Sequence, residues 1–394
     1  MNRLKYKGLE LLGILSGNRA FAGPEWVQID LTNMCNNNCI GCWCNSPLLG
    51  EKGMSALAKQ QKLSFHVVKK LIDDLRSLGT RRIFLCGGGE PLVHPKIREV
   101  ISYIKENRIV CALNTNFTLV NKELAKWLVD IGLDEITISL WASNPKTYSE
   151  THPNKTGNDF VKIRETIKFM QDYKTKKSKE KPVVKLYNVI FNLNYKDIKS
   201  MISFAESVNA EMIEFAPLDP IPKKTEVLLL NENQRKELLS EVKEIVREKQ
   251  AGRCKKTEVL IETFYERIKN KKSTRGIYDD VVVKELPCYV GWVFARIMAD
   301  GSVVPCLKAH RMPIGNIYKK SFKKIWNSKK YNNFRRMAVL FNKKNPFFKN
   351  IGNNPSGCFS SCDNIADNMS INNNLIVKVI RGKIFEMKNK KNKK

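Results

Sequence analysis

The chain has 394 residues, of which 42% are hydrophobic, and this is typical of a folded protein with one large domain and a smaller one. No apolar run reaches the length of about 18 residues that crosses a bilayer, which excludes a membrane-spanning helix. The net charge of +30 favours anionic partners such as nucleic acid, phosphorylated metabolites or an acidic membrane surface. Eleven clustered cysteines argue against a disulfide framework and for metal sites in a reducing compartment, so we expect a cytoplasmic protein.

The two ends of the chain are expected to lie outside the main domains. Residues 1–24 predict a short amphipathic helix, because Lys7 and Glu10 interrupt the apolar run that a secretory signal needs. Residues 366–394 form a basic tail, whose last part is either solvated or contacts a membrane or an anionic substrate. No aromatic RNA-binding motif is evident, so nucleic acid is not expected as a partner.

From residue 25 onward, β-branched runs alternate with amphipathic stretches. Strands are predicted at 25–31, 81–88, 110–116, 134–141, 183–191 and 211–218, with helical patterns at 64–79, 95–107, 159–173, 197–208 and 231–250. Six such units predict an α/β fold with a parallel sheet covered by helices. The periodicity leaves a closed barrel, a partial barrel and an open sheet as alternatives. A second domain is expected to begin between 250 and 285, with a β-hairpin over 293–306 turned at Asp300–Gly301.

Three cysteines follow the first predicted strand with the spacing C-x3-C-x2-C, namely Cys35, Cys39 and Cys42. A redox pair, a disulfide, a zinc site and an iron–sulfur cluster are all candidates for such a group. A 4Fe–4S cluster takes four thiolates, so three from one loop leave one iron free. The spacing resembles the signature of the radical SAM superfamily, in which the free iron binds the amino and carboxylate groups of S-adenosylmethionine. Cys44 fits no family position and is interpreted as an ordinary thiol.

Other strand ends carry residues that match the same family. By resemblance, the GGEP motif after the second strand and polar positions ending strands three to six line the S-adenosylmethionine pocket: Gly88, Gly89, Glu90, Pro91, Asn116, Ser139, Asn192 and Ala216. One departure concerns the aromatic residue that the family usually has before the third cysteine, which is Gly41 here. Trp43 either substitutes for it or packs elsewhere.

Four more cysteines lie near the end of the chain. Cys288, Gly301 and Cys306 fit C-x12-G-x4-C, and Cys358 and Cys362 follow as C-x3-C. This pattern resembles a short SPASM or twitch extension, which implies an auxiliary 4Fe–4S cluster on four thiolates. A four-cysteine zinc site is the alternative. The remaining Cys86, Cys111 and Cys254 match no motif, and the first two are interpreted as small strand residues.

The resemblance implies a partial (β/α)6 TIM-like barrel at 25–250, with a small cysteine-rich α+β extension at 280–365. It further implies an enzyme that reductively cleaves S-adenosylmethionine to a 5′-deoxyadenosyl radical, which abstracts hydrogen from a substrate. With the auxiliary cluster fully ligated, we expect a net two-electron oxidation of a small-molecule or saccharide alcohol, with flavodoxin or ferredoxin as electron donor. The motifs assign no catalytic acid or base.

Two other functions are compatible with the sequence. The first is a peptide-modifying maturase of the same superfamily, although residues 1–24 are too short for a leader-binding domain. The second, from another class, is a non-catalytic zinc protein that binds nucleic acid through its positive charge.

Overall fold

The structure is a computed structural model that describes residues 2–252, 256–340, 343, 345–352, 358 and 360–374. Cys254 and the basic tail from residue 375 onward lie outside the described residues. Within the described ranges, no helix is long and apolar enough to cross a membrane.

The described strands form one sheet in the order β10-β9-β8-β1-β2-β3-β4-β5-β6-β7. The strands are β1 (Trp26–Asp30), β2 (Arg82–Cys86), β3 (Val110–Thr115), β4 (Glu135–Ser139), β5 (Val183–Ile190), β6 (Met212–Pro217), β7 (Glu258–Leu260), β8 (Phe294–Ile297), β9 (Ser302–Val304) and β10 (Gly315–Asn316). All neighbours from β8 to β7 are parallel, whereas β9 and β10 are antiparallel additions. The sheet does not close on itself, so the predicted partial barrel is confirmed.

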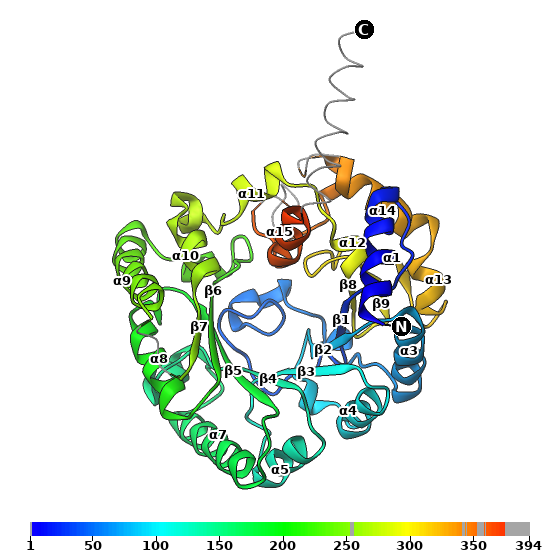
Figure 1. The fold of residues 1–394 in the computed structure, drawn as a ribbon. Coiled ribbons are helices and arrows are strands. Elements are labelled where there is room, and N and C mark those ends of the chain that lie inside the picture. Colours follow the sequence, from blue (N-terminus) through cyan, green and yellow to red (C-terminus); the bar gives the residue numbers. More distant parts are fainter. Residues whose placement is uncertain are drawn as a thin grey trace.

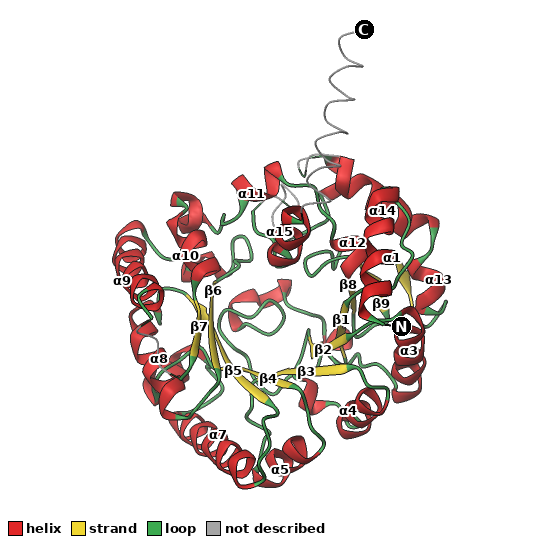
Figure 2. Cartoon of the chain, in the orientation of Figure 1, coloured by secondary structure: helices red, strands yellow, loops and turns green. Residues whose placement is uncertain are grey.

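Helices cover the outer side of this curved sheet (Figures 1 and 2). The helices of the described residues are α1 (Arg3–Ser16), α2 (Ala56–Lys59), α3 (Phe65–Leu78), α4 (Ile97–Glu106), α5 (Lys122–Asp130), α6 (Pro145–Thr151), α7 (Gly157–Lys176), α8 (Ile198–Ser207), α9 (Glu232–Gln250), α10 (Glu262–Lys269), α11 (Asp280–Glu285), α12 (Val290–Val293), α13 (Phe322–Trp326), α14 (Lys329–Leu340) and α15 (Ile365–Asn373). Figure 1 shows α3, α4, α5, α7 and α8 along the outside of the strands, and α11, α12 and α15 at the gap between β8 and β6.

Local sequence explains why these helices begin, end and pack where they do. In α3, Val68, Leu71 and Leu75 recur at helical spacing and are buried against the sheet. The Ser64 side chain accepts a hydrogen bond from the Val67 amide at the start of the helix. Gly79 ends it in the left-handed conformation, with φ of 86°. The predicted N-terminal amphipathic helix is also present as α1.

The register of the sheet brings the carboxyl ends of the central strands together. Asp30 pairs with Cys86, Thr115 with Ile138, and Ser139 with Tyr187. Because parallel strands end at the same edge, the loops that follow them surround one space.

The predicted C-terminal hairpin is formed by β8 and β9, and Gly301 turns it with φ of 82°. The sequence did not predict that β8 also pairs in parallel with β1, with Trp26 opposite Phe294. A buried ion pair joins the same two strands, since Arg296 donates to Asp30 Oδ2 at 2.6 and 3.0 Å. The sheet therefore runs through both predicted domains.

Candidate active site

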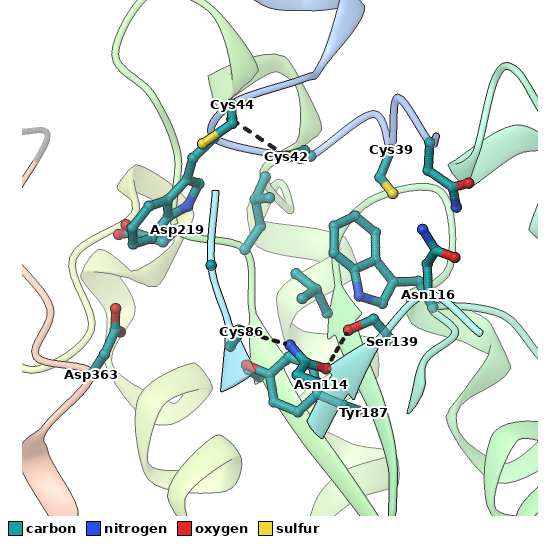
Figure 3. Close-up of a pocket in the computed structure, with 18 of the residues that line it drawn as sticks. Cys39, Cys42, Cys44, Cys86, Asn114, Asn116, Ser139, Tyr187, Asp219 and Asp363 are labelled. Atoms are coloured by element: carbon teal, nitrogen blue, oxygen red, sulfur yellow. Dashed lines mark hydrogen bonds between the residues drawn. The ribbon is translucent and has the colours of Figure 1, made fainter. Parts of the chain in front are cut away.

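A cavity of about 340 Å³ lies at the carboxyl ends of the central strands (Figure 3). Its lining includes most of the predicted site residues, namely Cys35, Cys39, Cys42, Gly89, Glu90, Asn116, Ser139 and Ala216. Of the predicted set outside the C-terminal cysteines, Gly88, Pro91 and Asn192 do not line it.

The loop that carries the first three cysteines is held from both ends. The Glu90 amide donates to the Met34 carbonyl at 2.8 Å, and the Ile40 amide donates to the Thr151 carbonyl at 3.0 Å. Asn116 donates through Nδ2 to Asn36 Oδ1 at 2.9 Å. Asn116 thus ties the end of β3 to the cysteine loop in addition to lining the cavity.

The three thiols lie in a buried environment that disfavours two of the three thiolates unless a positive charge compensates them. Backbone amides donate to sulfur at 3.4 Å, from Asn37 to Cys35 and from Asn45 to Cys42. Burial raises the pKa of Cys35 to about 12 and raises that of Cys39 as well. A hydrogen bond with the Cys44 side chain lowers the pKa of Cys42 to about 6. Buried thiolates need a compensating positive charge, which iron supplies, so this donor set fits a cluster.

The glycine loop after β2 packs directly against the cysteine loop. A Cβ at Gly88 would lie 2.2 Å from Asn33 Oδ1, and one at Gly89 would lie 2.1 Å from the Met34 carbonyl. Only glycine permits this approach. Pro91 occupies the first turn of the short 3₁₀ helix Pro91–Val93, which the Glu90 side chain caps. Gly88 and Pro91 therefore shape the loop rather than the cavity surface.

Glu90 is the buried carboxylate of the site, with 3% of its surface exposed. It accepts hydrogen bonds from Thr115 Oγ1 and the Asn116 amide, both at 2.7 Å, and from the Leu92 amide at 3.1 Å. Burial nevertheless raises its pKa to about 7. A cation beside Glu90 would favour the ionised form.

Strand β5 contributes residues other than the predicted one. Asn192 donates through Nδ2 to the Val227 carbonyl at 2.8 Å, and its amide donates to the Leu228 carbonyl. It lies beyond the end of β5, which stops at Ile190. Because side chains alternate along a strand, Tyr187 and Val189 line the cavity together.

The missing aromatic residue before Cys42 has a structural replacement. A Cβ at Gly41 would lie 2.8 Å from Leu218 Cδ1 and 3.5 Å from the Trp141 ring, so these side chains already occupy the space. Trp141 follows β4 with φ of 57° and lines the cavity. Trp43 also lines it, with Lys308 Nζ 5.8 Å from its ring centroid. The sequence pattern points only to Trp43, since Trp141 is distant along the chain.

Two thiols that seemed unremarkable in the sequence also line the cavity. Asn114 donates through Nδ2 to Cys86 Sγ at 3.1 Å, and Ser139 donates to Asn114 Oδ1 at 3.1 Å (Figure 3). The interpretation of Cys86 as merely a small strand residue is therefore incomplete. Cys44 is a second cavity thiol, next to Cys42. By contrast, Cys111 is fully buried in the core.

The four C-terminal cysteines surround a separate small pocket of about 20 Å³: Cys288, Cys306, Cys358 and Cys362. Burial raises the pKa of the last three. Asn368 of α15 donates to Cys288 Sγ at 3.6 Å. Across the described ranges, no three His, Cys, Asp or Glu side chains form the ligand set of a single metal ion. Four thiols around one pocket match the ligand count of a 4Fe–4S cluster.

The two cysteine groups flank the same cavity. The cavity lining includes Ser361 and Asp363, which precede and follow Cys362 in the chain. Asp363 also lines the smaller pocket, so it belongs to the wall between the two sites.

Comparison with known proteins decides what these groups hold. Residues 29–205 match the model of the radical SAM superfamily, and residues 288–363 match that of SPASM, an iron–sulfur cluster-binding domain. The chain belongs to the radical SAM superfamily. Zinc, the alternative for both cysteine groups, is not what these two domains hold, because both imply 4Fe–4S clusters and the first implies S-adenosylmethionine.

Two curated relatives match most of the chain. A tungsten-containing aldehyde ferredoxin oxidoreductase cofactor-modifying protein of Pyrococcus furiosus is 23% identical over 79% of this chain and 83% of the relative. A probable GTP 3′,8-cyclase of Sulfolobus acidocaldarius is 28% identical over 82% of this chain and 95% of the relative.

Solved structures share the fold. SuiB of Streptococcus suis bound to S-adenosylmethionine superposes with a TM-score of 0.64 at 15% identity, covering 91% of this chain and 77% of SuiB. The enzyme anSMEcpe with bound AdoMet gives a TM-score of 0.57 at 14% identity, covering 80% of both chains. The α/β fold with a C-terminal extension is thus that of SPASM-containing radical SAM enzymes.

Proposed function

We propose that this radical SAM enzyme catalyses the net two-electron oxidation of a small-molecule or saccharide alcohol. The observation that carries the proposal is the single cavity between the two cysteine groups, since a substrate there would face both. The bound clusters would supply and accept single electrons, with S-adenosylmethionine cleaved reductively. Cys35, Cys39 and Cys42 would hold one cluster, and the four C-terminal cysteines the other.

The cavity residues would bind and orient S-adenosylmethionine. Glu90 accepts from the ammonium of its methionine part, and Asn116 keeps the cysteine loop in place. Ser139 and Ala216 line the space that remains, and Trp141 offers an aromatic face in the region of Gly41. We also propose a cytoplasmic location and a flavodoxin or ferredoxin as reductant, because the buried thiols require reducing conditions.

A small-molecule substrate is favoured by the relatives that match along most of their length, which are named for modifying a cofactor and for cyclising GTP. Peptide modification is the second candidate, because SuiB, which has the same fold, was solved bound to a precursor peptide. Incubation with dithionite and S-adenosylmethionine tests the shared chemistry. We expect 5′-deoxyadenosine from the anaerobically reconstituted enzyme, and its absence from fully loaded protein would contradict the proposal.

The pKa of Glu90 predicts how S-adenosylmethionine binding depends on pH. Since burial raises this pKa to about 7, the carboxyl is largely neutral at pH 6 and half ionised at pH 7. The ammonium prefers the ionised form, so affinity should increase about fivefold between these values, below the α-amino pKa of about 7.7. Equilibrium dialysis of labelled S-adenosylmethionine measures the change.

The variant Glu90→Gln provides the control for this profile. It should bind more weakly and show no dependence on pH over the same interval, while keeping its first cluster by electron paramagnetic resonance. A flat profile for the unmodified enzyme would show that Glu90 does not contact the ammonium.

A further inference from the structure

One wall of the cavity carries two carboxylates, Asp219 and Asp363 (Figure 3). Asp219 follows β6, and Asp363 follows Cys362 in the C-terminal segment. Lys308 Nζ lies 2.9 Å from Asp219 Oδ1 and 3.8 Å from Asp363 Oδ1. Ser361 donates to Asp219 Oδ1 at 2.9 Å. We call Asp219, Asp363, Lys308 and Ser361 the acidic wall.

The ion pairs around this wall give its two carboxylates one shared lysine. The cavity is also lined by Arg267 and Arg296, but each already has its own carboxylate. Arg267 pairs with Asp279 at 2.8 and 3.0 Å, and Arg296 pairs with Asp30 at 2.6 and 3.0 Å. Lys308 is then the single cation shared by Asp219 and Asp363 within the described part of the chain. The net charge of +30 for the whole protein does not extend to this wall.

Unpaired polar atoms around the cavity independently indicate a polar occupant. Asp219 Oδ2 is inaccessible and, among the described residues, has no hydrogen-bond partner. Trp141 Nε1 and the side-chain oxygen and nitrogen of Asn37 are likewise buried without a hydrogen-bond partner among the described residues, and Asn37 is only 3% exposed. Burying such a group without a partner is unfavourable, and for the acceptor Asp219 Oδ2 a ligand with donors would offset that cost, whereas Trp141 Nε1 needs an acceptor. Asp363 keeps 28% of its side chain accessible and faces the same space.

We propose that the acidic wall binds a protonated amine of the substrate, with Asp219 as the residue that sets this specificity. The proposal rests on the proposed function, because it places the substrate in the cavity between the two cysteine groups. An ammonium supplies the missing positive charge and donates to Asp219 and Asp363. A phosphate at the same place would bring further negative charge next to two carboxylates that share one lysine. The substrate class is therefore an amine-bearing alcohol rather than a phosphorylated one.

Three sugars of one scaffold test the charge preference. D-Glucosamine, D-glucose and D-glucose 6-phosphate are titrated calorimetrically, without oxygen, into enzyme loaded with clusters and S-adenosylmethionine. We expect glucosamine to bind at least about tenfold more tightly than glucose 6-phosphate, with glucose between them. Equal or tighter binding of glucose 6-phosphate would overturn the proposal, and so would the absence of any glucosamine binding.

The variant Asp219→Asn identifies the wall as the origin of the preference. It keeps the size of the side chain but removes the excess charge, so the advantage of glucosamine should fall about tenfold. Asp172→Asn, on the exposed surface of α7, makes the same charge change elsewhere and should leave the order of the three sugar affinities unchanged. An unchanged preference in Asp219→Asn would overturn the assignment.

The experiments distinguish a failure of the acidic-wall proposal from a failure of the proposed function. If loaded enzyme forms 5′-deoxyadenosine but shows no preference for glucosamine, only the acidic-wall proposal is wrong. If it forms none although both clusters are present, the proposed function itself is wrong.

Discussion

Replacing Cys35, Cys39 or Cys42 with alanine is expected to abolish both 5′-deoxyadenosine formation and substrate turnover. Each substitution removes one of three ligands, and the loss should exceed the roughly 100-fold effect of changing an outer-shell partner. Replacing Cys362 with alanine should instead leave dithionite-driven 5′-deoxyadenosine measurable while oxidised product disappears. Chromatographic quantification of both products in the same reactions measures the two effects.

Because β8 pairs with β1, the extension is part of the barrel sheet, and losing its metal could disturb the fold. Correct folding of each variant must therefore be verified. Cys362 suits the test, since its amide donates to Asp279 at 2.8 Å and its carbonyl accepts from Arg267 at 3.0 Å without the thiol. Cys111→Ala is a matched control, because that thiol is buried in the core and lines neither pocket, and it should keep both activities. If Cys362→Ala retains its first cluster and still makes normal product, the C-terminal cluster is not the electron acceptor.

Breaking the ion pair between the two parts of the sheet should have the largest effect on stability. Asp30 is 1% exposed, and the variant Arg296→Met leaves its carboxylate buried without its cation. An uncompensated buried charge of this kind costs about 3–5 kcal/mol. We therefore expect the free energy of unfolding, measured by chemical denaturation, to fall by that amount.

An exposed pair gives the matched comparison. Arg98 and Glu123 are 2.8 Å apart with most of the Glu123 side chain in solvent. Because exposed pairs contribute at most about 1 kcal/mol, Arg98→Met should change stability little. Equal effects of the two variants would mean that the Arg296–Asp30 pair does not hold β8 against β1.

The parts of the fold that depend on local pattern could be predicted from the sequence. The six core strands, α3 and α9 follow from hydrophobic periodicity and end signals such as Gly79. The cysteine loop and Glu90 were found because their spacing is local, and the structure brings both to one cavity. Asn192 does not line the cavity, because the exact end of β5 decides which side chains face inward.

The parts that depend on distant contacts could not be predicted. Trp141 lies 100 positions from Gly41, and only the curvature of the sheet brings its ring into the space that Gly41 leaves. The pairing of β8 with β1 likewise joins residues that are far apart in the chain, and nothing in either strand alone specifies its neighbour. The acidic wall has the same origin, since Asp219 and Asp363 come from different domains.

The iron content of the reconstituted enzyme tests most directly the central claim that one cavity lies between two cluster sites. Anaerobic reconstitution followed by iron and sulfide analysis should give about eight of each per chain, because each 4Fe–4S site contributes four. Zinc should be absent from both sites. A plateau near four irons, or zinc retained in place of the second four, would contradict the account, because the substrate would then face only one redox centre.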